Sequence, residues 1–181
     1  MRAWQFEIVD LGSRKDETPL IKIHPTAEIS SLADIEDSVL GSRISIGAGT
    51  VIDSFVKVKP AGGLSDLAIG RNVVINSGTV IYTGNGVSIG DHVAIAANCT
   101  FAPVNHEVRR RDELIMRQGF APSRGGITIE EDVWIGAGCV ILDGARVRRG
   151  CVIGAGSIVR GELEPYTIYA GHPLRKIGVR A

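Results

Sequence analysis

The sequence is poor in aromatic residues and carries no net charge. Aromatic residues make up 5% of the 181 residues, whereas hydrophobic residues make up 44%. A single domain of this length must therefore build its core from Val, Ile, Ala and Gly. Twenty basic residues balance twenty acidic ones, so no global electrostatic field would gather nucleic acid or a membrane surface. We expect no nucleic-acid partner.

The sequence also lacks a long apolar run and a paired cysteine motif. No stretch approaches the roughly 18 consecutive apolar residues that a bilayer-spanning helix needs, and Glu7 and Asp10 lie where a signal peptide would be apolar. Cys99, Cys139 and Cys151 are odd in number and form no CxxC motif, which suits a reducing compartment. We expect a cytoplasmic protein without membrane insertion, whose cysteines are small core residues.

What the sequence does have is a period of six residues. Aliphatic residues occupy one unbroken frame at Ile129, Ile135, Ile141, Val147, Ile153 and Val159, and again at Ile69, Ile75 and Ile81. In a strand, the aliphatic residue and the residue two before it point inward, and the one between them points outward. A unit this short buries only one large side chain, so the units must stack into a parallel β-solenoid with a continuous core.

The six-residue frame is interrupted at four places. It shifts at residues 39–40, breaks at 59–68, gains about two residues at 83–86, and is lost from Pro103 to Gly126, a polar loop of 24 residues. Loops of that length are uncommon in compact domains and are usually functional or disordered. We expect an N-terminal cap over residues 1–22, a solenoid over 23–160 with loop 103–126 inserted, and a C-terminal cap over 161–181.

The repeat units resemble a known family. IGAGTV, IGAGCV and IGAGSI, together with EDVWIGAGCVIL and YTIYAGHPLRKI, resemble the hexapeptide-repeat acyltransferases over about residues 23–178. The resemblance implies an all-β fold, a single-stranded left-handed parallel β-helix in which three hexads form one triangular coil. It also implies a homotrimer and acetyl-CoA as co-substrate, with no metal required. The left hand is carried over from the resemblance, because crossovers between parallel strands are usually right-handed.

The outward positions support the trimer independently. If about 18 residues make one coil, the stacked outward pairs are Trp134 with Val152, Val140 with Ile158, and Thr128 with Arg146. Two faces are then apolar and the third is polar, as a subunit with two neighbours in a closed ring requires. The alternative is that outward Val merely reflects strand propensity.

His106 is the candidate catalytic residue. It is the only one of four histidines in the long loop, and histidine accepts a proton near neutral pH without large tuning. By itself a loop histidine is more often a solvated bystander. However, the series Ile89, Gly90, Asp91, Asn98 and His106 resembles, in order and spacing, the segment that carries the catalytic base in galactoside and maltose acetyltransferases. The resemblance implies that His106 is a general base for direct transfer, without an acyl-enzyme.

The same resemblance assigns roles to further residues. It implies that Asn76 contacts the acceptor, although an Asn at a coil corner also has a structural explanation. It implies that the backbone N–H of Ala137 stabilises the oxyanion. The CoA-binding residues it implies are Ala137, Ala155, Arg160, Gly161, Arg175 and Lys176. Two departures from the pattern are Gly84, where the galactoside branch has a sugar-binding carboxylate, and Gly178, where the family has a second basic residue.

The acceptor is open at this stage. The stretch from Asn105 and His106 through QGF to ITIEEDVWIGAG resembles the branch that O-acetylates O-antigen and capsule sugars. We therefore expect the acetyl acceptor to be a hydroxyl, or an amine, of a sugar or surface-polysaccharide precursor. The run Arg109 to Arg111 would attract an anionic acceptor, or is simply solvated.

The alternative functions are a xenobiotic acetyltransferase of the chloramphenicol or streptogramin type, and a γ-type carbonic anhydrase. The latter needs a close histidine pair plus a third histidine for zinc, and this chain has no such pair.

Overall fold

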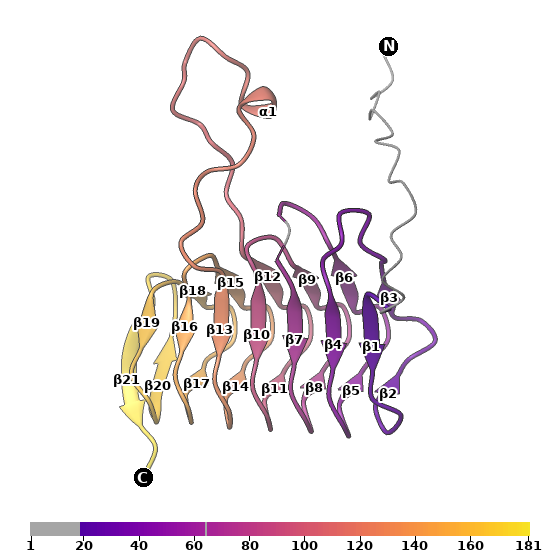
Figure 1. Cartoon of the computed structure of the whole chain (residues 1–181). Helices are drawn as coiled ribbons and strands as arrows, with labels where there is room; N and C mark the ends of the chain where they lie inside the picture. Colours follow the sequence, from indigo (N-terminus) through magenta and orange to yellow (C-terminus); the bar gives the residue numbers. More distant parts are fainter. Residues whose placement is uncertain (1–18, 64) are drawn as a thin grey trace.

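The chain winds into a triangular prism whose three sides are parallel β-sheets (Figure 1). The computed structural model describes residues 19–63 and 65–181. The expected cap over residues 1–22 falls almost entirely outside these residues, and the first strand begins at Ile21. No helix in the described part of the chain is long and apolar enough to cross a membrane.

We name the sheets A, B and C in the order in which the chain visits them. Sheet A contains β1 (Ile21–Ile23), β4 (Ile44–Ile46), β7 (Leu67–Ile69), β10 (Val87–Ile89), β13 (Ile127–Ile129), β16 (Arg146–Val147) and β19 (Glu162–Leu163). Sheet B contains β2 (Glu28–Ile29), β5 (Val51–Ile52), β8 (Val74–Ile75), β11 (Ala94–Ile95), β14 (Trp134–Ile135), β17 (Val152–Ile153), β20 (Thr167–Ala170) and β21 (Arg175–Val179). Sheet C contains β3 (Asp34–Ile35), β6 (Lys57–Lys59), β9 (Val80–Tyr82), β12 (Thr100–Ala102), β15 (Val140–Leu142) and β18 (Ile158–Val159). One short helix, α1 (Ile115–Gln118), lies in the long loop.

The coil is left-handed, and its register is the expected one. In Figure 1 the chain descends through sheet A at the front, crosses sheet B at the bottom and rises through sheet C behind, while it advances away from β1. The stacked outward pairs are Thr128 with Arg146, Trp134 with Val152, and Val140 with Ile158. The 18-residue coil and the three predicted columns are therefore confirmed for this part of the chain.

The core is a stack of aliphatic side chains, one layer per coil. Val133 and Ile135 are buried, while Trp134 between them is 50% exposed, so the predicted alternation holds. Each buried Val or Ile contributes about 1.5–3 kcal/mol. The three cysteines are also buried, and burial raises the pKa of the Cys151 thiol. The prediction that they are core residues is confirmed.

The two glycines of the IGAG corner have different roles. Gly136 lies directly against the next coil, since an added Cβ would come within 2.6 Å of the Ala155 nitrogen. Gly138 has a φ of 69°, a left-handed conformation that side chains disfavour. The first glycine therefore permits close stacking of the coils, and the second permits the turn.

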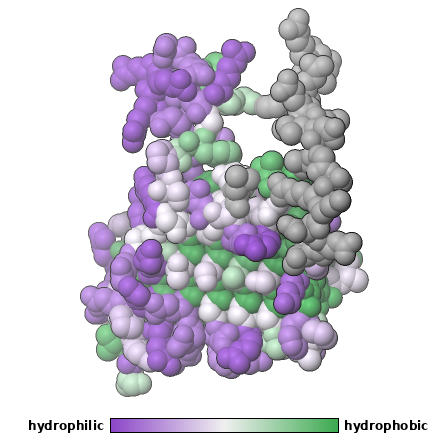
Figure 2. All heavy atoms as spheres, viewed as in Figure 1, coloured by the Kyte–Doolittle hydropathy of each residue, from purple (hydrophilic) through white to green (hydrophobic). Residues whose placement is uncertain are grey.

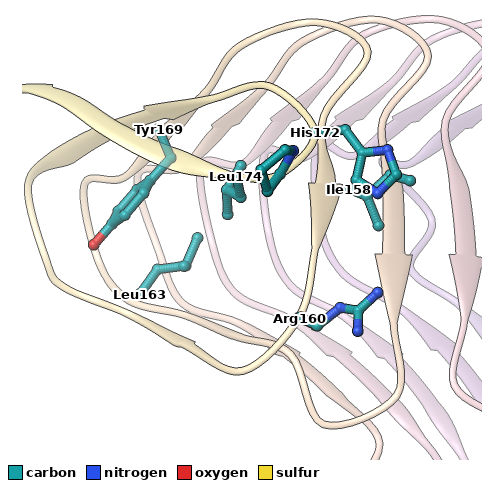
Figure 3. Close-up of a pocket in the computed structure, with 7 residues that line it drawn as sticks. Ile158, Arg160, Leu163, Tyr169, His172 and Leu174 are labelled. Carbon is teal, nitrogen blue, oxygen red and sulfur yellow. The ribbon is translucent and has the colours of Figure 1, made fainter.

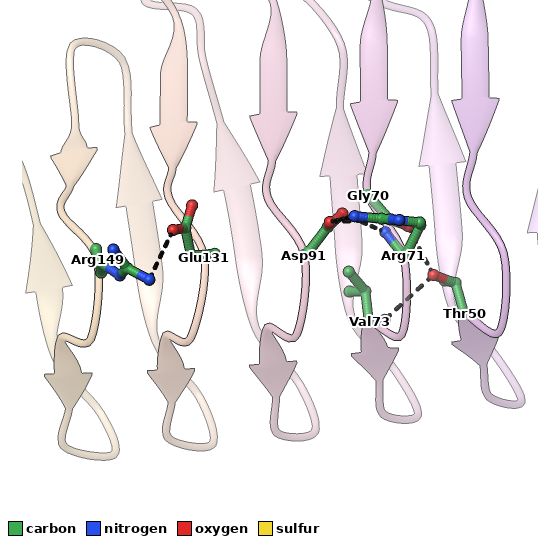
Figure 4. A network of polar contacts seen from close by, with 7 residues as sticks. All are labelled: Thr50, Gly70, Arg71, Val73, Asp91, Glu131 and Arg149. Carbon is green, nitrogen blue, oxygen red and sulfur yellow. Dashed lines mark hydrogen bonds and ion pairs between the residues drawn. The ribbon is translucent and has the colours of Figure 1, made fainter.

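The corner between sheets A and B is tied by polar contacts from coil to coil (Figure 4). Arg71 and Asp91 form an ion pair at 2.7 Å, and the hydrogen bonds from Arg71 lower the pKa of the Asp91 carboxyl. Glu131 and Arg149 pair at 3.2 Å two coils further along. Asp91, part of the series that suggested the catalytic segment, thus links neighbouring coils.

All four interruptions of the repeat fall at one corner, between sheets C and A. They follow β3, β6, β9 and β12 and precede β4, β7, β10 and β13. Ile44 pairs with Ile21, 23 residues earlier, whereas Arg146 pairs with Thr128, only 18 residues earlier. Figure 1 shows the added segments rising from this edge, with loop 103–126 the longest. Two corners of the prism remain regular and the third collects the variable segments.

The solenoid extends further toward the C-terminus than expected. β19 and β20 continue the parallel pairing beyond residue 160, because Glu162 pairs with Arg146 and Ile168 pairs with Val152. β21 then folds back antiparallel on β20. The closing element is therefore a two-stranded hairpin rather than a cap that starts at residue 161.

Candidate active site

Loop 103–126 is a paired hairpin that extends away from the prism (Figure 1). His106 lies within this loop. His106 forms a backbone bridge with Phe120. On either side of this bridge, the Glu107 N–H donates to the Gly119 carbonyl at 3.1 Å, and the Ala121 N–H donates to the Asn105 carbonyl at 2.8 Å. The two limbs of the loop thus hold His106 from both sides.

The His106 side chain lies at the surface, beside the ring of Phe120. The two ring centroids are 5.0 Å apart, with the planes tilted by 36°. His106 is exposed, and Phe120 is also half exposed, at 51%. An exposed imidazole packed on one aromatic ring has limited freedom yet remains open to an acceptor.

The tip of the loop is held together by Gln118 at the end of α1. The Gln118 side chain accepts from the Arg110 N–H at 3.1 Å and donates to the carbonyls of Arg110 and Glu113 at 2.8 and 2.9 Å. Arg110 pairs with Glu113 at 2.7 Å, and hydrogen bonds from the backbone N–H groups of Arg109 and Val108 lower the pKa of Glu107. Figure 2 shows this tip as a largely hydrophilic surface. Part of the Arg109–Arg111 run is therefore already neutralised within the loop.

Asn76 lies at a different corner from the loop. It follows β8, at the corner between sheets B and C, and its side-chain amide donates to the Ile95 carbonyl of the next coil at 2.8 Å. His106 belongs to a loop that leaves the corner between sheets C and A. Within one chain, the structure does not bring Asn76 and His106 together.

Ala137 and Ala155 lie at the same corner as Asn76. Both are exposed, and they belong to successive coils, since the Gly156 N–H donates to the Ala137 carbonyl at 2.8 Å. Among the described residues, no acceptor is bonded to the backbone N–H of either alanine. The corner therefore offers a strip of short side chains with free N–H donors.

A cavity of about 480 Å³ lies at the C-terminal end of the prism (Figure 3). Its lining consists of Ile158, Arg160, Leu163, Tyr169, His172, Pro173 and Leu174. The cavity thus joins the end of β18 to the turn before β21. His106 is not among its lining residues.

Two of the three basic residues expected to bind CoA, Arg175 and Lys176, lie on β21, and they differ in their partners. Lys176 pairs with Glu164 at 2.6 Å, and that hydrogen-bonded carboxylate raises the pKa of the Lys176 amino group. Arg175 is exposed, and its guanidinium donates to the Leu174 carbonyl at 3.3 Å. Gly161, also expected to bind CoA, accepts from the Arg146 N–H at 2.9 Å. Arg175 is therefore the more available cation of the pair.

Some residues of this region escaped the sequence analysis. His172 lies outside the long loop and was not among the predicted site residues, yet it lines the C-terminal cavity with Arg160. Asp143, at the foot of the long loop, is buried with 3% exposure. The sequence offered one signal for Asp143, an acidic residue directly after the strand of a six-residue unit. It offered no local signal that His172 lies near Arg160. Within residues 19–63 and 65–181, no group of three potential ligands lies close enough to hold a metal ion.

Comparisons with known proteins agree with this architecture. The pattern of the family described as bacterial transferase hexapeptide (six repeats) matches residues 126–161. Galactoside O-acetyltransferase of Escherichia coli K12 is 39% identical over 117 residues, which cover 62% of this chain and 54% of that protein. This chain therefore spans only about half the length of that relative.

Two other relatives are similar over more of their length. The protein YJL218W of Saccharomyces cerevisiae, named provisionally as an acetyltransferase, is 31% identical over 170 residues, covering 93% of this chain and 83% of that one. A crystal structure of a mutant of AntD, an N-acyltransferase from Bacillus cereus, contains dTDP-4-amino-4,6-dideoxyglucose and coenzyme A. It aligns with a TM-score of 0.75 and 27% identity, covering 90% of this chain and 84% of that one. Taken with the six-residue repeat and the triangular left-handed coil, these similarities show that the chain belongs to the hexapeptide-repeat transferase family.

Proposed function

We propose that this chain is an acetyl-CoA-dependent acetyltransferase that acts on a hydroxyl or amine of a sugar or surface-polysaccharide precursor. The observation that carries the proposal is the placement of His106, held by paired backbone on a hairpin at the edge of a transferase β-helix. The relatives support the substrate class. One is named for galactoside O-acetylation, and a solved relative holds a dTDP-linked amino sugar together with coenzyme A.

The proposed reaction is a direct transfer with His106 as general base. The His106 imidazole removes a proton from the acceptor hydroxyl or amine, and the acceptor atom attacks the thioester carbonyl. The resulting oxyanion receives a hydrogen bond from the Ala137 N–H, a preorganised donor of the kind that stabilises such intermediates. The C–S bond then breaks, and the CoA thiolate leaves and takes up the proton. The scheme uses no thiol nucleophile, because the three cysteines are buried.

The proposed site is completed by a second copy of the chain. Loop 103–126 leaves one corner of the prism, whereas Asn76, Ala137 and Ala155 lie at another. The outward column of sheet B begins with Glu28 and is apolar from there on, with Val51, Val74, Ala94, Trp134, Val152 and Ile168. Sheet C is apolar toward the C-terminal coils, although near its start Lys57 pairs with Asp34 at 3.0 Å. Two such faces fit a closed trimer in which the loop of one subunit reaches the strip of small residues on its neighbour.

The trimer predicts that a charge on sheet B breaks the assembly. We expect Trp134→Arg to sediment as a monomer at micromolar concentration and to lose transferase activity, because an unpaired guanidinium in an apolar interface costs several kcal/mol. Thr128→Arg is the matched control, since Thr128 is an outward position of the same coil on sheet A. A monomeric wild-type protein, or a trimeric Trp134→Arg variant, would contradict the trimer.

For the donor, we propose that Arg175 pairs with a phosphate of CoA. A charge-assisted hydrogen bond is worth about 1.5–3 kcal/mol, so Arg175→Ala should raise the KM for acetyl-CoA roughly tenfold or more, with kcat unchanged. Lys176→Ala should have a smaller effect, because Lys176 is already paired with Glu164. Steady-state kinetics with acetyl-CoA, and with acetyl-CoA lacking its 3′-phosphate, measure both changes. Equal KM values for wild type and Arg175→Ala would rule out this contact.

The acceptor is tested by a thiol-release assay. Acetyl-CoA is offered with nucleotide sugars, nucleotide amino sugars, free glycans and chloramphenicol, and CoA release is recorded with each. We expect release with a sugar hydroxyl or amino sugar. Release with chloramphenicol alone would favour the xenobiotic alternative, and no detectable binding of CoA by calorimetry would refute the acetyltransferase proposal.

A further inference from the structure

Among the residues that the structure describes, Asp143 is the only Asp, Glu, Lys, Arg or His whose side chain is buried. It follows β15 at the corner between sheets C and A, where the long loop begins and ends. A buried carboxylate without hydrogen-bond partners is strongly unfavourable. The partners of the Asp143 carboxylate therefore show which segments of the chain it holds together.

The Asp143 carboxylate receives three hydrogen bonds, two of them from the returning limb of the loop. The Gly126 N–H donates to Oδ1 at 3.0 Å, and the Arg124 N–H donates to Oδ2 at 2.9 Å. The Asn85 side-chain amide also donates to Oδ2, at 3.3 Å. Backbone N–H bonds to a carboxylate are among the stronger hydrogen bonds in proteins. The side chain therefore ties the loop to the neighbouring segment 83–86.

The backbone next to the carboxylate holds both ends of the loop. The Asp143 N–H donates to the Ala102 carbonyl at 3.1 Å, at the point where the loop departs, and the Gly144 N–H donates to the Gly126 carbonyl at 2.7 Å, where it returns. Residues 143 and 144 thus clip the two ends of loop 103–126 together.

The outgoing limb has a second, apolar seat. A Cβ added at Gly62 would come within 2.9 Å of Val104 Cγ1, and one added at Gly84 would overlap with the same methyl group. Val104, two residues before His106, therefore occupies the space left by the absence of side chains at Gly62 and Gly84. Gly84, where galactoside relatives are expected to have a carboxylate, is part of this seat.

We propose that Asp143 is a positioning residue for His106. Asp143 has no direct part in the proposed reaction. It acts by fixing the two ends of loop 103–126, and this keeps the His106 imidazole in one position relative to the proposed site. This inference rests on the proposed role of His106 as general base. Displacement of a catalytic group by about 1 Å can cost on the order of 10²-fold in rate, so a carboxylate remote from the chemistry can influence kcat.

The test is Asp143→Asn in the full-length protein. Asparagine keeps the shape of the side chain but turns an amide group toward N–H donors that previously met an oxygen. We expect amide exchange at Glu107 and Ala121, whose N–H groups bond across the loop, to be at least about tenfold faster by mass spectrometry. We expect kcat to fall by about 10- to 100-fold, with the KM for acetyl-CoA unchanged.

Two further measurements separate positioning from general destabilisation. Glu130→Gln is the matched control, because Glu130 accepts hydrogen bonds from Arg148 and Arg149 and has no hydrogen bond to the loop. It should leave loop exchange and kcat unchanged. In the His106→Asn background, Asp143→Asn should lower kcat no further, because effects that pass through the same group are not additive. If Asp143→Asn fails to fold, Asn85→Ala removes only one donor and should shift exchange and kcat in the same direction.

The outcomes distinguish this inference from the proposed function. Unchanged amide exchange in the loop of Asp143→Asn would show that Asp143 does not hold loop 103–126 in place, whatever the activity of the variant. Faster exchange with unchanged kcat, or an additive loss in the double variant, would overturn the positioning role and leave the proposed function intact. A wild-type protein that binds no CoA would overturn the proposed function, and with it the catalytic role of Asp143, while the exchange result would still decide whether Asp143 holds the loop.

Discussion

His106→Asn is expected to lower kcat by about 10²- to 10⁴-fold, the range that removal of a general base typically costs. The asparagine amide can still hydrogen-bond to an acceptor but cannot accept its proton at neutral pH. Because the His106 side chain is exposed, the variant should keep its thermal stability and its oligomeric state. Thiol release from acetyl-CoA with a saturating acceptor, followed across pH, gives the measurement.

The control for this substitution is His24→Asn. His24 is also exposed, and its Nδ1 lies 3.0 Å from the Thr26 hydroxyl at the opposite end of the prism. It should keep the wild-type kcat. Near-normal kcat in His106→Asn would refute the assignment of the base, and an equal loss in both variants would point to a general effect of removing imidazole groups from the protein.

Phe101→Ala is expected to lower the free energy of unfolding by about 3–5 kcal/mol, since truncating a buried phenylalanine loses its transfer free energy and leaves a cavity. Phe101 is 0% exposed. It lies in β12, the last strand before the long loop, and stacks between Ile81 and Ile141 of the adjacent coils. Urea denaturation should be measured at one fixed protein concentration, because the proposed assembly would contribute to the apparent stability.

The matched control is Phe55→Ala. Phe55 is 67% exposed and sits at a coil corner, so its truncation should change stability by no more than about 0.5 kcal/mol. Equal destabilisation by the two substitutions would contradict the burial of Phe101 in the core.

The proposed site was only partly predictable from the sequence. His106 stood out because it is the one histidine in the long loop, and in the structure it pairs with Phe120 across that loop. Its role as base stays a prediction, as do the roles of Arg160, Gly161 and Arg175. Asn76 shows why residue type alone is insufficient, because its amide is bonded to the Ile95 carbonyl of the next coil. Whether it also contacts an acceptor depends, in the proposed trimer, on the neighbouring subunit.

The sequence by itself determined the solenoid, the inward and outward sides of each strand and the three columns of outward residues. These follow from local alternation and a constant period: once Ile135 points inward, Trp134 must point outward, and Val152 must follow one coil later. The left-handed coil came from resemblance, and the structure agrees with it.

Only the tertiary structure decided that every interruption of the repeat lies on one corner, that the solenoid continues through β20, and that Asp143 holds both ends of the loop. Coils of 23 and of 18 residues occur in the same chain, so the position of each insertion on the prism depends on the summed lengths of all preceding segments. The partners of Asp143, at Asn85, Arg124 and Gly126, are up to 58 residues away in sequence. No local pattern encodes such contacts, because stacking alone brings those segments to the same edge.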